Sequence, residues 1–311
     1  MGKLAFIFPG QGAQIVGMGK DLYDAYDLAK KRFAEADEAL GYSISKLCFE
    51  GPAEKLQLTE HTQPAILTVE VIAAELLREA GVVPEVAGGH SLGEYGALVL
   101  AGVMSFRDAV LLVHKRGAYM QEAVPVGEGA MAAVIGLDDE SIVAVCNDAS
   151  SAGAVQAVNF NCPGQTVIAG TVQGVERAVE LLKEKGAKKA VILPVSAPFH
   201  STLMAPAAKK LAAELDKVEL HAAAFPVVSN YTGKLQQTAA EIKENLVAQA
   251  DHPVRWITCV ETMKAFGADT YIECGPGKTL AGFNKRIDKS LVSMNVENVD
   301  SLQKTLDTLK K

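Results

Sequence analysis

Hydrophobic positions along the 311-residue chain form short apolar runs that alternate with longer segments of helical spacing. Residues 4–8 are a short apolar run that stops at a Pro-Gly pair, which predicts a buried strand ending in a loop. Residues 62–80 predict a long helix, with Pro64 in its first turn and Gly81 just past its end. Strands that alternate with helices favour an α/β domain with a mainly parallel sheet.

The same pattern continues on both sides of a central segment. A strand at residues 86–90 turns directly into a helical run at 92–104, and a further helix starts near Ser105, a plausible N-cap followed by Asp108. The other elements expected outside the central segment are helices at 21–40, 203–215, 241–249 and 256–266 and strands at 225–229 and 270–274.

The order of elements changes after Pro125. From there the pattern is strand, helix, strand, strand, helix, strand, and this βαββαβ order is typical of a ferredoxin-like subdomain. We therefore predict that residues 126–194 form an inserted ferredoxin-like subdomain. Residues 1–125 and 195–311 would together form a large α/β-hydrolase-like catalytic domain.

Composition and charge narrow the class of protein. The chain is 49% hydrophobic and 22% charged, as is ordinary for a soluble enzyme, and its length allows a large core. No apolar stretch approaches the ~20 residues that span a bilayer, so no membrane segment is expected. The net charge of −7 disfavours nucleic acid as a partner.

The five cysteines are odd in number and widely spaced, without a CxxC pair. This pattern disfavours both a disulfide framework and a zinc site, and the six histidines form no tight cluster. We expect a cytoplasmic protein with free thiols and no metal.

A G-x-S-x-G motif, residues 89–93, lies between a predicted strand and a predicted helix. In this context Ser91 would sit on a sharp turn and act as a nucleophile. The N–H groups at the start of the following helix would face a tetrahedral oxyanion, and the backbone N–H of Leu92 is its first candidate donor. The alternative is a tight turn in which the serine only caps the helix.

A nucleophilic serine needs a base, because its hydroxyl reacts poorly at neutral pH. His90 adjoins Ser91 but should point away from it, and His114 lies in a helix. His200 lies in a proline-rich loop after a strand, where catalytic side chains are often presented. Position alone favours His200 and leaves a structural role for it open.

Two nucleotide-binding patterns are incomplete. The sequence Gly277-Lys278-Thr279 ends like a P-loop, but Ile272 occupies the position of its first glycine. Gly10 and Gly12 begin a dinucleotide fingerprint, but its third glycine is Ile15. We therefore expect no nucleotide site of either kind.

Taken together, separated motifs along nearly the whole chain resemble the malonyl-CoA:acyl carrier protein transacylases of fatty-acid synthesis. The motifs are Phe8-Pro9-Gly10-Gln11-Gly12, Gln63-Pro64-Ala65, Gly89-His90-Ser91-Leu92-Gly93-Glu94, Arg116, Asn159-Phe160-Asn161, Pro163-Gly164-Gln165, Phe199-His200, Pro253-Val254-Arg255-Trp256 and Glu273-Cys274-Gly275-Pro276-Gly277. The resemblance implies Ser91 as nucleophile and His200 as base. It also implies that a backbone carbonyl near Gln249 orients the imidazole, and that the N–H groups of Gln11 and Leu92 form the oxyanion hole.

The resemblance also implies a substrate pocket. Arg116 would hold the free carboxylate of a malonyl group, since a guanidinium can bind a carboxylate through two parallel hydrogen bonds. Met120, four residues later, shares its helix face and would line the pocket. Phe199 would narrow the pocket against a branched α-carbon, and Gln63 and Asn161 would be polar supports.

The implied reaction is a ping-pong transfer from malonyl-CoA to the phosphopantetheine thiol of acyl carrier protein, without a metal or redox cofactor. The implied carrier is acidic and binds transiently, and we expect the enzyme to be a monomer. Candidate docking residues are Lys188, Lys189, Lys278, Lys285 and Arg286. Three alternatives remain: a serine esterase or thioesterase, a trans-acting polyketide acyltransferase, and a non-catalytic carrier-binding module.

Overall fold

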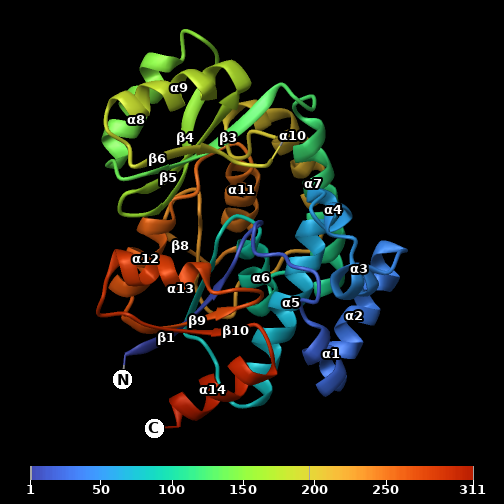
Figure 1. Cartoon of the computed structure of the whole chain (residues 1–311). Helices are drawn as coiled ribbons and strands as arrows, with labels where there is room; N and C mark the ends of the chain where they lie inside the picture. The colour runs from blue at the N-terminus through green and yellow to red at the C-terminus, as the bar shows by residue number, and fades with distance from the viewer. Residues whose placement is uncertain (1, 196, 311) are drawn as a thin grey trace.

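The computed structural model describes residues 2–195 and 197–310. Its larger body is built on a six-stranded sheet with the order β10-β9-β1-β2-β7-β8 (Figure 1). The strands are β1 (Lys3–Phe8), β2 (Val86–Gly89), β7 (Val227–Val228), β8 (Leu235–Gln236), β9 (Ala268–Cys274) and β10 (Val292–Val296). Every pairing in this sheet is parallel except that of β7 with β8, so the prediction of a mainly parallel sheet is confirmed.

Helices cover both faces of this sheet, which explains the uninterrupted apolar run of β1. Phe6 and Phe8 pack into the core on one face, whereas Ala5 and Ile7 pack into the core on the other. The helices of this body are α1 (Lys20–Ala25), α2 (Asp27–Leu40), α3 (Ile44–Glu50), α4 (Ala53–Leu56), α5 (Thr59–Glu79), α6 (Gly93–Leu100), α7 (Phe106–Glu122), η1 (Thr202–Met204), α10 (Ala205–Leu215), α11 (Ala239–Gln249), α12 (Trp256–Ala265), α13 (Thr279–Ile287) and α14 (Val299–Leu309).

A second, four-stranded antiparallel sheet comes from the central segment and lies at the top of Figure 1. Its elements are β3 (Gly129–Ile135), α8 (Asp139–Ala149), β4 (Val155–Cys162), β5 (Gln165–Thr171), α9 (Val172–Glu184) and β6 (Lys189–Ile192). The strand order β4-β5-β3-β6 is that of the split βαβ arrangement, which confirms the ferredoxin-like topology.

Each face of this smaller sheet has its own core. Ala130 and Ala132 of β3 pack against α8 and α9, whereas Met131 between them points to the opposite face. On that opposite face Met131 shares a core with Phe199 and Met204 of the larger body. The smaller sheet is therefore apolar on both faces, and one of these faces packs on the larger body.

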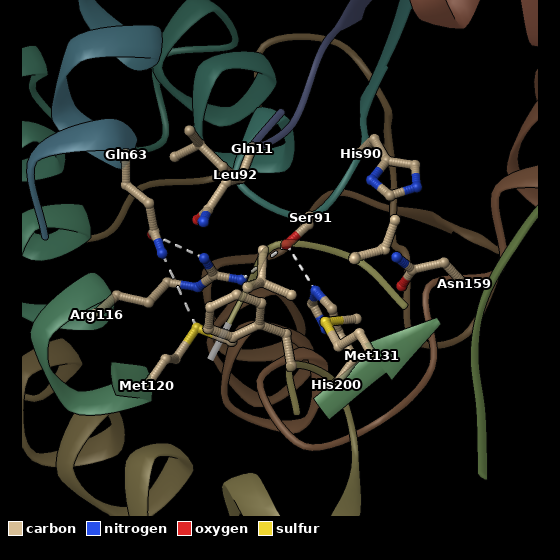
Figure 2. A pocket seen from close by; sticks show the side chains of 13 residues that line it. Gln11, Gln63, His90, Ser91, Leu92, Arg116, Met120, Met131, Asn159 and His200 are labelled. Atoms are coloured by element: carbon tan, nitrogen blue, oxygen red, sulfur yellow. Dashed lines mark hydrogen bonds between the residues drawn. The ribbon is translucent and has the colours of Figure 1, made fainter. Parts of the chain in front are cut away.

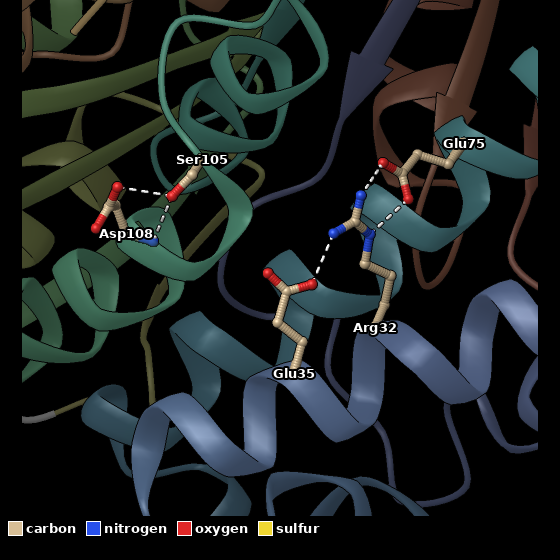
Figure 3. Close-up of polar contacts among 5 residues, drawn as sticks. All are labelled: Arg32, Glu35, Glu75, Ser105 and Asp108. Carbon is tan, nitrogen blue, oxygen red and sulfur yellow. Dashed lines mark hydrogen bonds and ion pairs between the residues drawn. The ribbon is translucent and has the colours of Figure 1, made fainter. Parts of the chain in front are cut away.

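The helices of the larger body are joined by polar side chains that Figure 3 shows. Ser105 caps α7 as predicted, because its Oγ accepts from the N–H of Asp108 at 3.0 Å. Arg32 of α2 donates to both carboxylate oxygens of Glu75 on α5, at 2.5 and 2.7 Å, and to Glu35 on its own helix. The bonds between Arg32 and Glu75 join α2 to α5.

Several predicted boundaries were wrong. Helix α5 begins at Thr59, so Pro64 lies in the second turn and not in the first. The helical run expected at 92–104 ends at Leu100, and the helix expected at 21–40 is broken at Tyr26 into α1 and α2. The elements without any prediction were α3, α4, β8, β10, α13 and α14. In the described part of the chain, no helix has both the length and the apolar character needed to cross a bilayer.

Candidate active site

Ser91 lies where β2 ends and α6 begins, on a turn that only glycine neighbours allow. A Cβ on Gly89 would lie 1.9 Å from the carbonyl carbon of Gly93, and one on Gly93 would lie 2.1 Å from the carbonyl oxygen of Phe8. Ser91 itself has a φ of 54°, in the left-handed region that is unfavourable for a side-chain-bearing residue. The turn therefore holds the Ser91 hydroxyl away from the backbone and into a cavity.

His200 reaches this hydroxyl from a distant part of the chain. Ser91 Oγ and His200 Nε2 are 2.7 Å apart, and His200 Nδ1 lies 2.8 Å from the carbonyl oxygen of Gln249 (Figure 2). A carbonyl can only accept, so Nδ1 carries the proton and Nε2 has a free lone pair facing Ser91. Burial and then the nearby Arg116 charge lower the pKa of His200 to about 3, which keeps the ring neutral.

Gln11 and Leu92 both line the cavity beside Ser91. In the described part of the chain, the backbone N–H of neither residue donates to another protein group. The N–H of Ser91 is already used, because it donates to Asn230 Oδ1 at 2.6 Å. The two unused donors are therefore available to an oxyanion that forms on an ester or thioester of Ser91.

Arg116 of α7 enters the cavity from the side opposite His200 (Figure 2). Its guanidinium donates to Gln63 Oε1 at 2.7 Å, to Gln249 Oε1 at 2.9 Å and to Ser91 Oγ at 3.1 Å. The Tyr95 ring lies 5.4 Å away, within the range of a cation–π contact. Arg116 is only 1% exposed, and burial lowers its pKa.

In the described part of the chain, no carboxylate is among the hydrogen-bond or ion-pair partners of Arg116. Buried Glu94 raises the pKa of Arg116 only through space, so an anionic ligand in direct contact would further offset the desolvation of the guanidinium. The cavity therefore favours a ligand that carries a carboxylate a short distance from the carbon that Ser91 attacks.

The rest of the cavity, which has a volume of about 110 Å³, is lined mainly by apolar side chains, together with polar His90 and Asn159. Met120 of α7 lies beside Gln63, whose Nε2 is 4.0 Å from the Met120 sulfur. Phe199 precedes the base, and Met131 closes the cavity from β3 of the inserted sheet. Two further lining residues are Leu193 and Val195. Sequence reasoning missed Met131, because no local signal in an apolar strand shows which face meets a distant cavity.

Asn161 lies outside this cavity. Its Oδ1 bonds to His90 Nε2 at 2.8 Å, and it borders a neighbouring groove with Gln165 and Phe283. His90 points toward Asn161 and not toward the Ser91 hydroxyl. The groove and the cavity are continuous, since Gln11 and Leu193 border both.

A buried polar network beneath Ser91 was not predicted. Gln249 Nε2 donates to Glu94 at 2.7 Å and to the carbonyl of Ser91 at 3.0 Å. Asn230 donates from its backbone to Glu94 at 3.0 Å and from its side chain to the Gly89 carbonyl at 2.7 Å. Gln249 thus bonds the turn of Ser91, the ring of His200 and the guanidinium of Arg116. The only sequence signal was Glu94, a carboxylate in an otherwise apolar helix.

The strand–serine–helix turn, the neutral imidazole and the two unused N–H donors define a serine enzyme that transfers acyl groups. Known proteins identify the family within this class. A family model described as "Acyl transferase domain" matches residues 5–305. The chain is 49% identical to the malonyl CoA-acyl carrier protein transacylase of Bacillus subtilis (strain 168), covering 100% of this chain and 98% of that protein. It is 48% identical to the malonyl CoA-acyl carrier protein transacylase of Escherichia coli (strain K12), covering 99% of this chain and 100% of that protein.

Solved structures of the same family resemble this chain closely. The acyl-carrier-protein S-malonyltransferase of Burkholderia pseudomallei 1710b superposes with a TM-score of 0.96 at 50% identity, covering 98% of this chain and 99% of that one. A malonyl-transacylase solved in complex with its type II PKS acyl-carrier protein has a TM-score of 0.96 at 46% identity, covering 98% and 99%. The chain belongs to the malonyl CoA-acyl carrier protein transacylase family.

Proposed function

We propose that this enzyme transfers the malonyl group of malonyl-CoA to the phosphopantetheine thiol of acyl carrier protein, in fatty-acid biosynthesis. The observation that carries the substrate assignment is Arg116, a buried guanidinium with neutral partners only, 3.1 Å from the Ser91 hydroxyl. In a malonyl thioester one methylene separates the reacting carbonyl from a free carboxylate. This short separation suits a nucleophile and a cation that are adjacent.

In the first half-reaction, His200 Nε2 takes the proton of Ser91 Oγ as that oxygen attacks the thioester carbonyl carbon. The N–H groups of Gln11 and Leu92 hold the oxyanion of the tetrahedral intermediate. Collapse of the intermediate breaks the carbon–sulfur bond, and His200 returns the proton to the departing sulfur of CoA. The product is a malonyl ester of Ser91.

The second half-reaction reverses these steps with a different thiol. His200 takes the proton of the phosphopantetheine thiol as the thiol sulfur attacks the ester carbonyl carbon. The bond between that carbon and Ser91 Oγ then breaks, and His200 returns the proton to Ser91 Oγ. Proton transfer and acyl transfer account for every bond made and broken, so the route needs neither a metal nor a redox cofactor. Arg116 would hold the same carboxylate throughout both steps.

A basic region beside the groove supports a docking surface for an acidic carrier. Arg286 donates to Gln165 Oε1 at 2.6 Å and to the Pro163 carbonyl at 2.9 Å, which holds it beside the β4–β5 turn at the groove. Lys188 packs beside Gly136, whose N–H bonds the carbonyl of Gly164 in that same turn. Exposed Lys278 directly precedes α13, and exposed Lys285 lies on α13, the helix that also carries Arg286.

The docking proposal is tested with Lys188→Glu and Lys285→Glu. Each should raise the KM for the carrier several-fold, more strongly at low salt, while the rate of Ser91 acylation by malonyl-CoA stays unchanged. Lys304→Glu is the control, since Lys304 is an exposed residue of α14, which lies at the bottom of Figure 1. Equal effects of all three variants would exclude a localised docking surface.

The function itself is tested by mixing the enzyme with malonyl-CoA and measuring its intact mass. A malonyl adduct should form on the wild-type protein and be absent from Ser91→Ala. On addition of phosphopantetheinylated carrier, the adduct should move to the carrier much faster than it is hydrolysed. Faster transfer to water would instead identify a thioesterase, and absence of any adduct would identify a non-catalytic binding module.

A polyketide role is the second candidate, and one observation favours it: the relative of 46% identity was solved with a type II PKS carrier. Comparing transfer rates to a fatty-acid carrier and a polyketide carrier separates the two roles. We further propose a cytoplasmic location and a monomer. The five free, buried thiols support a reducing compartment.

A further inference from the structure

Pro64 lies inside helix α5, where it has no backbone N–H to give. The carbonyl that loses its partner is four residues earlier, at Glu60. This partly buried carbonyl is bonded by a side chain of another helix: His114 Nδ1 of α7 lies 2.8 Å from Glu60 O. Because a carbonyl only accepts, His114 must be the donor. An imidazole thus replaces the missing hydrogen bond of the helix.

The segment of α5 held in this way carries groups that shape the active site. Thr59 Oγ1 accepts from Gln11 Nε2 at 3.3 Å, on the loop that supplies an oxyanion donor. Gln63 Oε1 accepts from Arg116 Nη1 at 2.7 Å. One turn of α5 therefore touches both the oxyanion loop and the guanidinium, and His114 bonds that turn.

The two helices approach closely at this place. A Cβ on Gly117 would lie 2.5 Å from the carbonyl oxygen of Thr59, so α7 contacts the backbone of α5 directly. His114 and Arg116 are two residues apart on α7, and their partners Glu60 and Gln63 are three apart on α5. Two adjacent hydrogen bonds thus join α5 to α7 beside the active site, whereas buried apolar side chains of both helices belong to the same core.

We propose that His114 is a positioning residue for the malonyl clamp: by bonding the Glu60 carbonyl that Pro64 leaves free, it fixes Gln63, and through Gln63 the guanidinium of Arg116. The proposal rests on the proposed function, because it assumes that Arg116 holds the malonyl carboxylate. His114 itself contacts no substrate. Its loss should weaken recognition of the carboxylate more than it weakens the chemistry at Ser91.

The test is a set of four variants compared with wild type. His114→Leu removes the donor at similar size. His114→Asn can keep a donor near the Nδ1 position. Pro64→Ala restores the backbone N–H to the helix, and the double variant His114→Leu/Pro64→Ala lets that N–H replace the imidazole. His61→Leu is the matched control, because His61 is a neighbouring ring that bonds Tyr42 and lies 3.8 Å from the Glu60 carboxylate, while His114 bonds the Glu60 carbonyl.

The measurement is the rate of Ser91 acylation by malonyl-CoA and by acetyl-CoA, followed by intact mass, with KM and kcat separated. For His114→Leu we expect the malonyl-to-acetyl ratio of kcat/KM to fall by roughly three- to tenfold, mainly through KM for malonyl-CoA. His114→Asn and the double variant should recover most of the ratio. Pro64→Ala and His61→Leu should keep it.

A purely structural role of His114 predicts a different result: malonyl and acetyl rates fall together, the ratio stays constant, and thermal stability falls. That outcome, or a double variant no better than His114→Leu, overturns the proposal while wild-type acylation by malonyl-CoA still supports the proposed function. If the wild-type enzyme itself shows no preference for malonyl-CoA over acetyl-CoA, both the clamp and this inference fail.

Discussion

Strained backbone occurs at the two residues that we propose as nucleophile and base. Within the described residues, Ser91 and His200 are the non-glycine residues with positive φ, at 54° and 61°. Such conformations cost free energy and persist only where the surroundings fix them. Gln249 helps to hold both conformations, because its side chain bonds the Ser91 carbonyl and its backbone carbonyl bonds His200. Hydrogen bonds from one residue thus reach both the turn of Ser91 and the ring of His200.

Replacing Arg116 should change which acyl group is accepted. For Arg116→Ala we expect kcat/KM with malonyl-CoA to fall by roughly 10²- to 10³-fold, since the substrate carboxylate loses its buried partner. Activity with acetyl-CoA should rise relative to malonyl-CoA. Arg107→Ala is the control on the same helix, because Arg107 is exposed and pairs with Glu38 at the surface. An unchanged acyl preference in Arg116→Ala would rule out the clamp.

The protonation of His200 should be unusual for a histidine. Burial, reinforced by Arg116, lowers its pKa from 6.5 to about 3, so the native ring should stay neutral across the range in which the unfolded ring takes up a proton. The unfolded state then binds more protons between those values, and this residue lowers the stability as pH falls from 6.5 toward 3. Nitrogen NMR of the ring, assigned with His200→Asn, measures the titration. A midpoint near 6.5 would contradict the assignment.

At the level of elements, the turn from β2 to α6 depends on close backbone contact. Strand β1 lies beside β2, and the carbonyl of its last residue, Phe8, touches Gly93 where α6 starts. This contact brings the loop after β1, with Gln11, next to the turn that holds Ser91. The two candidate oxyanion donors therefore come from neighbouring parallel strands that end at the same edge of the sheet.

An alanine at Gly93 should disrupt this turn. Its Cβ would lie 2.1 Å from the Phe8 carbonyl oxygen, so we expect Gly93→Ala to lose about 3 kcal/mol or more of unfolding free energy. Gly282→Ala in α13 is the matched control, because a Cβ there meets nothing within 4 Å. It should gain roughly 0.5 to 1 kcal/mol from helix propensity. Urea unfolding measures both, and similar stabilities would disprove the steric argument.

At the scale of the whole molecule, the cavity needs both bodies. Ser91 and Arg116 belong to the larger sheet and its helices, whereas Met131 belongs to the inserted sheet. The apolar face of that sheet, with Met131 and Val158, is covered by Phe199 of the larger body. The packing of Met131 against Phe199 therefore both closes the cavity and covers the apolar face of the inserted sheet.

This packing bears on the predicted boundaries of the insertion, residues 126–194. A fragment of that range would keep the core under α8 and α9 but would expose Met131, Val158 and Val167 on its other face. We expect it not to fold cooperatively on its own, since a small domain cannot lose one of its two cores. Circular dichroism under urea and the dispersion of its NMR spectrum test this. A sharp transition in the fragment would show an independent domain.

Much of the architecture could be predicted from local signals. The βαββαβ order, the Ser105 cap and the strand–serine–helix turn depend on patterns a few residues long, and the structure contains all three. Predictions of helix boundaries failed where a contact with a distant residue overrode the local sequence signal. Pro64 suggested a helix start at 62, but His114 from another helix bonds the carbonyl that Pro64 leaves free, and α5 extends back to Thr59.

The sequence by itself determined which groups are available for chemistry: a serine between glycines, a histidine in a proline-rich loop and an arginine in an amphipathic helix. These depend on residue type and near-neighbour spacing, which a sequence displays directly. Only the tertiary structure decided that the imidazole lies 2.7 Å from the hydroxyl and that Glu94, Asn230 and Gln249 hold them from below. Those residues are up to 158 positions apart, and packing of separate elements, not local propensity, brings them together.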